Sequence, residues 1–403
     1  MECGPPTYFL RIIVLDLSVY CEWMFTGPAS LSTNEEEPRR APTASMRYAR
    51  EAAVALRSVR DASRAALSLQ RRISLSQEAH QKGHDGTGFG VSPVTAADFM
   101  VQVLILGSLA QAFPHDRFIA EETGAELAAS GEATRAAVLS GLFDHSGLRI
   151  SEAEALARLD LGATGLEDSW SRTGRTWVLD PVDGTKGFLR GDHFAVALAL
   201  LDGGQPVFGV LGCPTITLEP PPQSGTLFWA ARGSGAFRLP THGRASGTFD
   251  ILDDMQGDAA DASALLRCST PLRVSKARRG EGLVRCEAFE SRHSNHHVAA
   301  QVASRLGVVR PPIRMDGQGK YGMVAAGEAA FYTRLPPDGY QENIWDHAAG
   351  SIVVEEAGGR VTDLRGQTLR FDGGAKISAG VRGIVASNGA CHDELLDALA
   401  GEG

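Results

Sequence analysis

Cysteine is scarce in this sequence, and its spacing indicates no structural cross-link. Six of the 403 residues are cysteines, and they are scattered over the chain: Cys3, Cys21, Cys213, Cys268, Cys286 and Cys391. A disulfide framework or a zinc site would need paired or regular spacing, so this pattern indicates neither. We therefore expect a reducing compartment, the cytoplasm.

The sequence also lacks a long apolar run and an excess of positive charge. The apolar stretch at residues 8–25 is interrupted by Arg11, Asp16 and Glu22, so we do not expect it to span a membrane. The formal net charge of −9 argues against a nucleic-acid polymer or an anionic membrane as partner. Anionic small molecules remain open as ligands, provided that a metal ion or a local basic cluster neutralises them.

The first 45 residues differ from the rest of the chain. Residues 33–43 are polar and contain two prolines and three successive glutamates, which is typical of a linker. We interpret residues 1–45 as a disordered extension, with an organellar targeting segment as the alternative. Residues 46–403 are expected to form the folded part.

Hydrophobic periodicity in the folded part predicts an α/β protein. Apolar residues recur at steps of three and four between Ala52 and Ile73, which predicts an amphipathic helix whose arginines, Arg60 among them, face away from the core. A second helix is expected to begin after Thr95, its predicted cap, with Asp98 in its first turn. Two hairpins are predicted from paired apolar runs, at 194–201 with 206–211 and at 226–231 with 235–239.

The stretch at residues 177–191 carries the strongest chemical signal. Val178 and Leu179 predict a strand that ends at Asp180, because Pro181 removes a backbone donor. The turn that follows brings Asp180 and Asp183 to one side, and carboxylates with a free carbonyl, that of Val182, are ligands that Mg²⁺ prefers. An ordinary surface turn is the alternative interpretation, since Asp, Pro and Gly are common turn residues.

Other acidic residues at similar positions favour the metal interpretation. Glu121 and Glu122 follow a predicted strand at 117–120, and Asp346 is expected at a helix start. Carboxylates held together repel one another unless cations neutralise them. The pattern therefore predicts a site for several Mg²⁺ ions that binds a phosphate and lowers the pKa of a bound water molecule.

These segments resemble a known family of phosphatases. Glu121-Glu122, the run from Asp180 to Thr185 and the run from Trp345 to Gly350 resemble the signatures of the lithium-sensitive inositol monophosphatase superfamily. The longer run 183–191, together with 92–95 and 340–342, is more specifically similar to the 3′(2′),5′-bisphosphate nucleotidases. The resemblance extends from about Met46 to near the C-terminus.

The resemblance implies a layered α/β/α/β/α sandwich with a catalytic domain at 46–403. An N-terminal part, about 46–212, would carry most metal ligands, and a C-terminal part, 213–403, would carry nucleotide contacts. The implied activity is hydrolysis of the 3′-phosphate of adenosine 3′,5′-bisphosphate to AMP, and of 3′-phosphoadenosine 5′-phosphosulfate. The family also implies inhibition by Li⁺ and a link to sulfur assimilation and salt sensitivity.

Residue roles are carried over from the resemblance by motif position. Two to three Mg²⁺ ions would be held by Glu121, Asp180, the Val182 carbonyl, Asp183 and Asp346. Asp98 and Thr185 would be catalytic, orienting and deprotonating the attacking water. The substrate would contact Thr185, His293, Gly317, Lys320, Arg334 and Asp346.

Two features set the limits of the resemblance. The family commonly has serine where this chain has Gly317, so one hydroxyl contact to the substrate is missing. An inositol polyphosphate 1-phosphatase or an inositol monophosphatase would share the metal carboxylates but would not need His293, Lys320 or Arg334. A catalytically silent nucleotide sensor ranks last, because no predicted metal ligand is missing.

We expect a monomer.

Overall fold

A computed structural model describes residues 46–81, 93–166, 174–218, 224–242, 252, 262–289, 296–337, 339–378 and 380–400. The predicted extension at 1–45 and the predicted substrate residue His293 lie outside these ranges. Among the described residues, no helix has the length and apolar character needed to cross a membrane.

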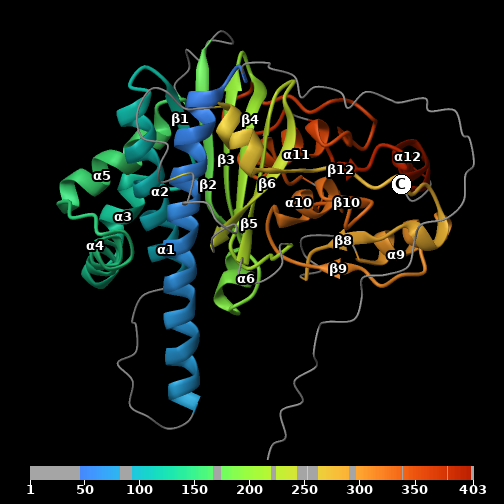
Figure 1. Cartoon of the computed structure of the whole chain (residues 1–403). Helices are drawn as coiled ribbons and strands as arrows, with labels where there is room; N and C mark the ends of the chain where they lie inside the picture. Colours follow the sequence, from blue (N-terminus) through green and yellow to red (C-terminus); the bar gives the residue numbers. More distant parts are fainter. Residues whose placement is uncertain are drawn as a thin grey trace, which may run out of the picture. The chain divides into compact units, whose positions relative to one another are not determined.

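A seven-stranded sheet forms the first of two β layers (Figure 1). Its strands follow chain order, and β1 pairs parallel with β2 while all later pairs are antiparallel. The strands are β1 (Arg117–Ala120), β2 (Arg175–Asp183), β3 (Ala195–Asp202), β4 (Gln205–Cys213), β5 (Ser224–Ala231), β6 (Gly235–His242) and β7 (Thr270–Pro271). Both predicted hairpins are confirmed, as β3–β4 and β5–β6.

A five-stranded sheet forms the second β layer, in the order β11-β12-β10-β8-β9. Its strands are short, and β8, β9 and β10 run parallel to one another. They are β8 (Arg285–Glu287), β9 (Ile313–Arg314), β10 (Phe331–Arg334), β11 (Arg360–Asp363) and β12 (Ile384–Ser387).

Helices cover both outer faces and fill the space between the sheets (Figure 1). The long helices α1 (Ala49–Gln81) and α2 (Pro93–Ala112) cover the seven-stranded sheet. Helices α10 (Gly319–Ala325) and α11 (Ala348–Glu356) lie between the sheets, and α9 (His296–Arg305) and α12 (His392–Ala400) cover the other face of the five-stranded sheet. The predicted α/β/α/β/α sandwich is confirmed.

The other helices of the described part of the chain are α3 (Gly124–Ala129), α4 (Glu132–Ser146), α5 (Glu152–Asp160), α6 (Thr185–Leu189), α8 (Ala262–Cys268) and the 3₁₀ turns Leu161–Ala163 and Gly280–Gly282.

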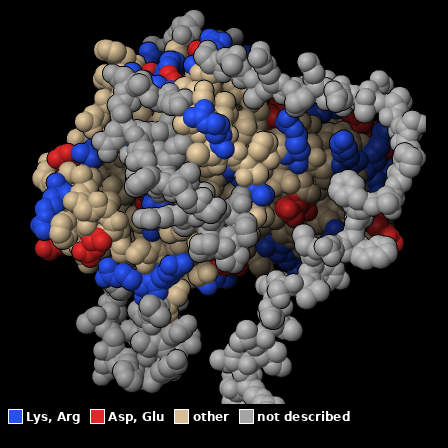
Figure 2. Space-filling model, in the orientation of Figure 1, with Lys and Arg blue, Asp and Glu red and all other residues tan. Residues whose placement is uncertain are grey.

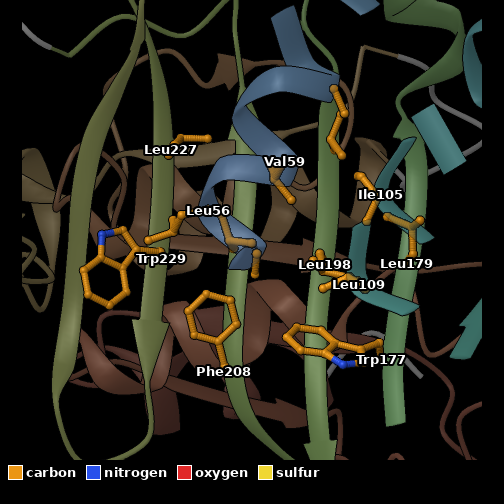
Figure 3. Packing of buried hydrophobic residues seen from close by; sticks show 14 of the residues in the cluster. Leu56, Val59, Ile105, Leu109, Trp177, Leu179, Leu198, Phe208, Leu227 and Trp229 are labelled. Atoms are coloured by element: carbon orange, nitrogen blue, oxygen red, sulfur yellow. The ribbon is translucent and has the colours of Figure 1, made fainter. Parts of the chain in front are cut away.

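The two faces of β3, in the middle of the seven-stranded sheet, carry residues of different size. Leu198 and Leu200 face α1 and α2, where Figure 3 shows large side chains such as Leu56 and Val59 packed against the strands. Ala197 and Ala199 alternate with them and face α11, as expected from the two-residue period of a strand. The small residues allow α11 to approach the sheet closely. At Gly209 of β4, an added Cβ would lie 2.8 Å from the carbonyl oxygen of Ala349.

Three local predictions are wrong. Helix α2 begins at Pro93, so Thr95 lies inside the helix and is not its cap, and Asp98 lies beyond the first turn; proline suits a first helical turn because its missing N–H needs no partner there. Arg60 is buried, and its Nε donates to Asp61 at 2.8 Å. Strand β2 does not end at Asp180 but continues to Asp183, because an irregularity in its pairing with β3 accommodates Pro181.

Candidate active site

A pocket of about 350 Å³ lies where the ends of β1 and β2 meet the loops of the second sheet. Its walls come from segments far apart in the sequence. They include Glu121, Asp180, Val182, Asp183, Gly184, Thr185, Lys186, Asp316, Gly317, Lys320, Tyr332, Arg334, Tyr340, Asn343 and Asp346. Most of the predicted site residues are therefore brought together here.

Three of the predicted metal ligands form a tight group. Carboxylate oxygens of Asp180, Asp183 and Asp346 all lie within 4.8 Å of one another. Asp180 Oδ1 is buried and has no hydrogen-bond partner among the described residues. A buried carboxylate oxygen without a donor is costly unless a cation satisfies it. The donor set, all oxygen, therefore fits Mg²⁺.

Burial and mutual repulsion raise the pKa values of these carboxyl groups. Burial raises the pKa of Asp180 well above its usual range, and the charges of Glu121, Asp183 and Asp346 add to the effect. Burial and Asp346 raise the pKa of Asp183 to about 6. The side chain of Glu121 reaches the surface, yet desolvation, Asp346 and Glu122 raise its pKa to about 8. Divalent cations bind carboxylates in their ionised form, so binding would reverse these shifts.

The two predicted catalytic residues lie at different depths. Thr185, the first residue of α6, lines the pocket, and its Oγ1 donates to the Val182 carbonyl at 3.4 Å. Asp98 is buried behind the carboxylates and does not line the pocket. Burial, followed by the charges of Glu122 and Glu121, raises the pKa of Asp98 well above its ordinary value. Only the ionised form of Asp98 can accept a proton, and cations bound at the neighbouring carboxylates would favour that form.

Gln102 fixes the backbone next to Glu121, a role that the sequence did not suggest. Its Nε2 donates to the Glu122 carbonyl at 2.6 Å, and its Oε1 accepts from the Glu122 N–H at 3.0 Å. Gln102 follows Asp98 by one helical turn on α2 and is fully buried. The four-residue spacing of Asp98 and Gln102 indicates that both lie on the same face of the helix. It does not indicate which group the Gln102 side chain binds.

Lys320 and Arg334 both line the pocket, and both already hold protein groups. Lys320 is buried, and its Nζ donates to the carbonyls of Gly317 at 2.7 Å and Met315 at 3.3 Å. Burial lowers the pKa of Lys320. Arg334 Nε donates to Glu342 Oε1 at 2.8 Å. Each cation is thus held in a fixed position at the pocket wall.

Glu342 connects Arg334 to a buried chain of hydrogen bonds. Its Oε2 contacts His347 Nε2 at 3.3 Å, and His347 Nδ1 contacts the Tyr321 hydroxyl at 2.7 Å. Burial opposes ionisation of Glu342, but contacts with His347 and Arg334 prevail and lower its pKa to about 2. These contacts give His347, next to Asp346 at the start of α11, a structural hydrogen-bonding role. The sequence indicated Glu342 only as the last residue of the run 340–342, without a role of its own.

Two glycines allow the turn after Asp183 and the loop around Gly317 to touch. Gly184 has φ +95°, and an added Cβ would lie 3.0 Å from the Gly317 nitrogen. Gly317 has φ +71°, and an added Cβ would clash with the Asp183 carbonyl. Positive φ and close backbone approach are conditions that glycine meets without strain. In this backbone, a serine at position 317 would not fit.

Comparisons with known proteins place the chain among related sequences. The profile of the inositol monophosphatase family matches residues 52–402. A 3′(2′),5′-bisphosphate nucleotidase of Oryza sativa is 36% identical over 371 residues, covering 87% of this chain and 94% of the relative. A protein of the same name from Dictyostelium discoideum is 33% identical over 347 residues, covering 86% and 95%.

Solved structures show the same fold at lower identity. CysQ from Bacteroides thetaiotaomicron, described as a bacterial member of the inositol monophosphatase family, is 18% identical with a TM-score of 0.52, covering 85% of this chain and 99% of its own. An inositol monophosphatase from Zymomonas mobilis is 17% identical, with a TM-score of 0.52 and coverages of 88% and 99%.

Proposed function

The chain belongs to the inositol monophosphatase family, and from this premise we propose that it is a Mg²⁺-dependent 3′(2′),5′-bisphosphate nucleotidase. Its substrates would be adenosine 3′,5′-bisphosphate, hydrolysed to AMP, and 3′-phosphoadenosine 5′-phosphosulfate. The observation that carries the proposal is the group of Asp180, Asp183 and Asp346 beside two fixed cations, Lys320 and Arg334. This arrangement suits a substrate with one phosphate to cleave and one to retain.

The metal ions would be held by Glu121, Asp180, the Val182 carbonyl, Asp183 and Asp346. When bound, Mg²⁺ supplies charge neutralisation for the phosphate and a lower pKa for a coordinated water molecule. The number of ions, two to three, follows from the family resemblance.

The chain's own residues would orient and deprotonate the attacking water. Thr185 lies on the pocket wall with its hydroxyl beside the Val182 carbonyl, so it is placed to hold a water molecule at that point. Asp98, buried close to Glu121 and Glu122, is proposed to act with Thr185 as the acceptor of the water proton. No covalent intermediate is required, and the described residues that line the pocket include no cysteine, serine or histidine placed as a nucleophile, His347 being engaged with Glu342 and Tyr321.

The retained 5′-phosphate would contact Arg334 and Lys320. Arg334 has a planar fork whose Nε is held by Glu342, which leaves its orientation fixed before substrate arrives. Lys320 would add a point charge from the floor of the pocket. His293 is proposed to contact the adenine or ribose by resemblance alone.

A comparison of substrates tests this proposal. Phosphate release is measured with adenosine 3′,5′-bisphosphate, inositol 1-phosphate and inositol 1,4-bisphosphate, each with Mg²⁺ and with excess chelator. We expect the nucleotide to be preferred and the chelator to abolish release. Asp180→Asn, which removes a charge but almost no volume, should also abolish turnover while thermal unfolding shows a retained fold. Preference for an inositol phosphate would favour the alternative function, and near-normal activity of Asp180→Asn would exclude the metal mechanism.

A further inference from the structure

A second cavity, of about 400 Å³, lies in the C-terminal part of the protein. Its lining comes from the segments that lead into three parallel strands: Gly282 and Val284 before β8, Arg310 to Ile313 at β9, and Gly327 to Ala330 before β10. The active-site pocket is lined by the segments that leave the same strands, such as Ala288 and Asp316. The two cavities therefore lie at opposite edges of one sheet and share no lining residue.

The second cavity carries a cation and an anion that are not paired. Arg310 and Glu328 both line it, and within the described ranges neither makes a salt bridge or a side-chain hydrogen bond. Both residues are exposed, so each charge is solvated in the free protein and is available to a ligand that carries both an anionic group and hydrogen-bond donors. The remaining walls are mostly apolar, from Val284, Pro311, Pro312 and Ile313.

A buried asparagine fixes a hydroxyl at the cavity wall. Asn388, 3% exposed, donates through Nδ2 to the Ser275 hydroxyl oxygen at 2.9 Å and to the Ala277 carbonyl at 2.8 Å. Its Oδ1 accepts from the Cys391 N–H at 3.1 Å, so the amide orientation is set by the backbone on both sides. The Ser275 oxygen is thus occupied as an acceptor, which leaves its proton to donate to a ligand. Ser275 lines the cavity.

The described residues of the segment 267–314, which supplies most of the cavity lining, carry an excess of cations although the chain as a whole is acidic. Among the described residues between 267 and 314, Glu281 and Glu287 are the acids, and Glu287 is neutralised by Arg285 and Arg314. The exposed cations nearest to the cavity in sequence are Arg273, Lys276, Arg278, Arg279 and Arg310. Figure 2 shows several groups of Lys and Arg atoms on the right-hand half of the molecule, where Figure 1 places the C-terminal sheet and its helices. A local excess of positive charge attracts small anions even though the net charge of the whole chain is −9.

We propose that this cavity is a second, non-catalytic binding site for a phosphorylated or sulfated small molecule. The anionic group faces Arg310 and the Ser275 hydroxyl, and hydroxyl or amino groups of the ligand face Glu328. A nucleoside monophosphate has this combination of groups. The choice of AMP as the first probe rests on the proposed function, because AMP is the product of that reaction.

Binding is measured by equilibrium dialysis of the full-length protein against labelled AMP, at constant ionic strength. We expect two sites per chain. Arg310→Glu should weaken one of them by about 10-fold to 100-fold, the effect of losing a charge-assisted contact. Ser275→Ala should weaken the same site by about 2-fold to 10-fold. Arg365→Glu, an equal change at an exposed arginine beside β11 at the other end of this sheet, should leave both sites unchanged.

Three further ligands test which chemical group the site recognises. Inorganic phosphate and sulfate should compete with AMP at the Arg310 site, whereas adenosine should not. A single AMP site, unchanged binding in Arg310→Glu, or adenosine binding as tight as that of AMP would each overturn the proposal. The measurement requires no turnover. A protein that binds AMP twice but fails to hydrolyse adenosine 3′,5′-bisphosphate would overturn the proposed function and leave the second site standing.

Discussion

Replacing Arg334 by alanine should weaken binding of the retained 5′-phosphate without slowing hydrolysis of the 3′-phosphate. Arg334 lies on the pocket wall at the end of β10, whereas Asp180 and Asp183 belong to β2, and it is proposed to contact only the phosphate that is not cleaved. A charge-assisted contact contributes about 1.5–3 kcal/mol, which corresponds to about 10-fold to 100-fold in binding. Because such an interaction is equal in the ground and transition states, KM should rise by that factor while kcat changes little.

The contacts of Arg334 with Glu342 complicate this variant and suggest its control. Glu342 is 1% exposed, and Arg334→Ala would remove one of its two charged or polar contacts, leaving His347. Removing one member of a buried ion pair costs about 3–5 kcal/mol of stability; the Arg334 side chain is 17% exposed, which favours the lower part of that range. The double variant Arg334→Ala/Glu342→Gln removes the unpaired charge and should recover part of this loss.

The assay is steady-state kinetics of both variants on two substrates, with thermal unfolding in parallel. Adenosine 3′,5′-bisphosphate carries the second phosphate, and a small monophosphate such as inositol 1-phosphate lacks it. The KM effect should be confined to the first substrate and should persist in the double variant. Arg334→Lys, which keeps the charge but loses the planar fork, should fall between parent and alanine. Equal losses on both substrates would refute the reasoning, because Arg334 would then support the fold or the catalytic centre.

Three other outcomes are expected. Lithium chloride should inhibit phosphate release relative to potassium chloride at equal ionic strength, and identical titration curves would contradict this. Gly317→Ser should destabilise the protein by about 1–3 kcal/mol in urea unfolding and should not improve substrate binding, because φ is +71° and the new Cβ would meet the Asp183 carbonyl. Burial lowers the pKa of His392 to about 4, and its ring nitrogens contact Thr362 and Ser387 at 2.9 and 2.8 Å. At His392 the folded protein therefore binds fewer protons than the unfolded chain below pH 6.5, so the contribution of this residue to the free energy of unfolding should fall by about 3 kcal/mol between pH 6.5 and 4. That contribution is the difference between the pH profiles of the parent protein and His392→Gln, and identical profiles would contradict the assignment.

Local patterns in the sequence predicted most of the elements that position the site. The spacing of apolar residues after Ala52 predicted α1, and the turn residues between 202 and 204 predicted the β3–β4 hairpin, because both signals act within a few residues. The five-layered order came from the family resemblance. Periodicity alone does not say which strands from distant segments pair, as β8 does with β9 and β10.

The failures have a common physical cause. Arg60 was expected to face water because its neighbours in the sequence follow a helical stripe, but its partner and its burial are set by tertiary packing. The strand through Asp180 was expected to stop at Pro181, but pairing with β3 carries it past an irregularity to Asp183. Gln102 and Glu342 were missed as positioning residues because the sequence does not show which group a polar side chain will bind. That becomes clear only once the fold brings the partner close.

Specificity within this family is best sought in the second sheet. The carboxylates proposed to hold metal follow β1, lie on β2 or stand at the start of α11, and an inositol phosphatase would need the same three segments. By contrast, Arg334 at the end of β10 is fixed by Glu342, and Glu342 is fixed by His347, which caps α11 next to Asp346. One chain of contacts thus joins the proposed site of the retained phosphate to a proposed metal ligand. A change at Glu342 should therefore alter substrate preference more than changes at surface positions around the pocket, and should do so through Arg334. If Glu342→Gln lowered activity equally on nucleotide and inositol substrates, Glu342 would act on Asp346 alone.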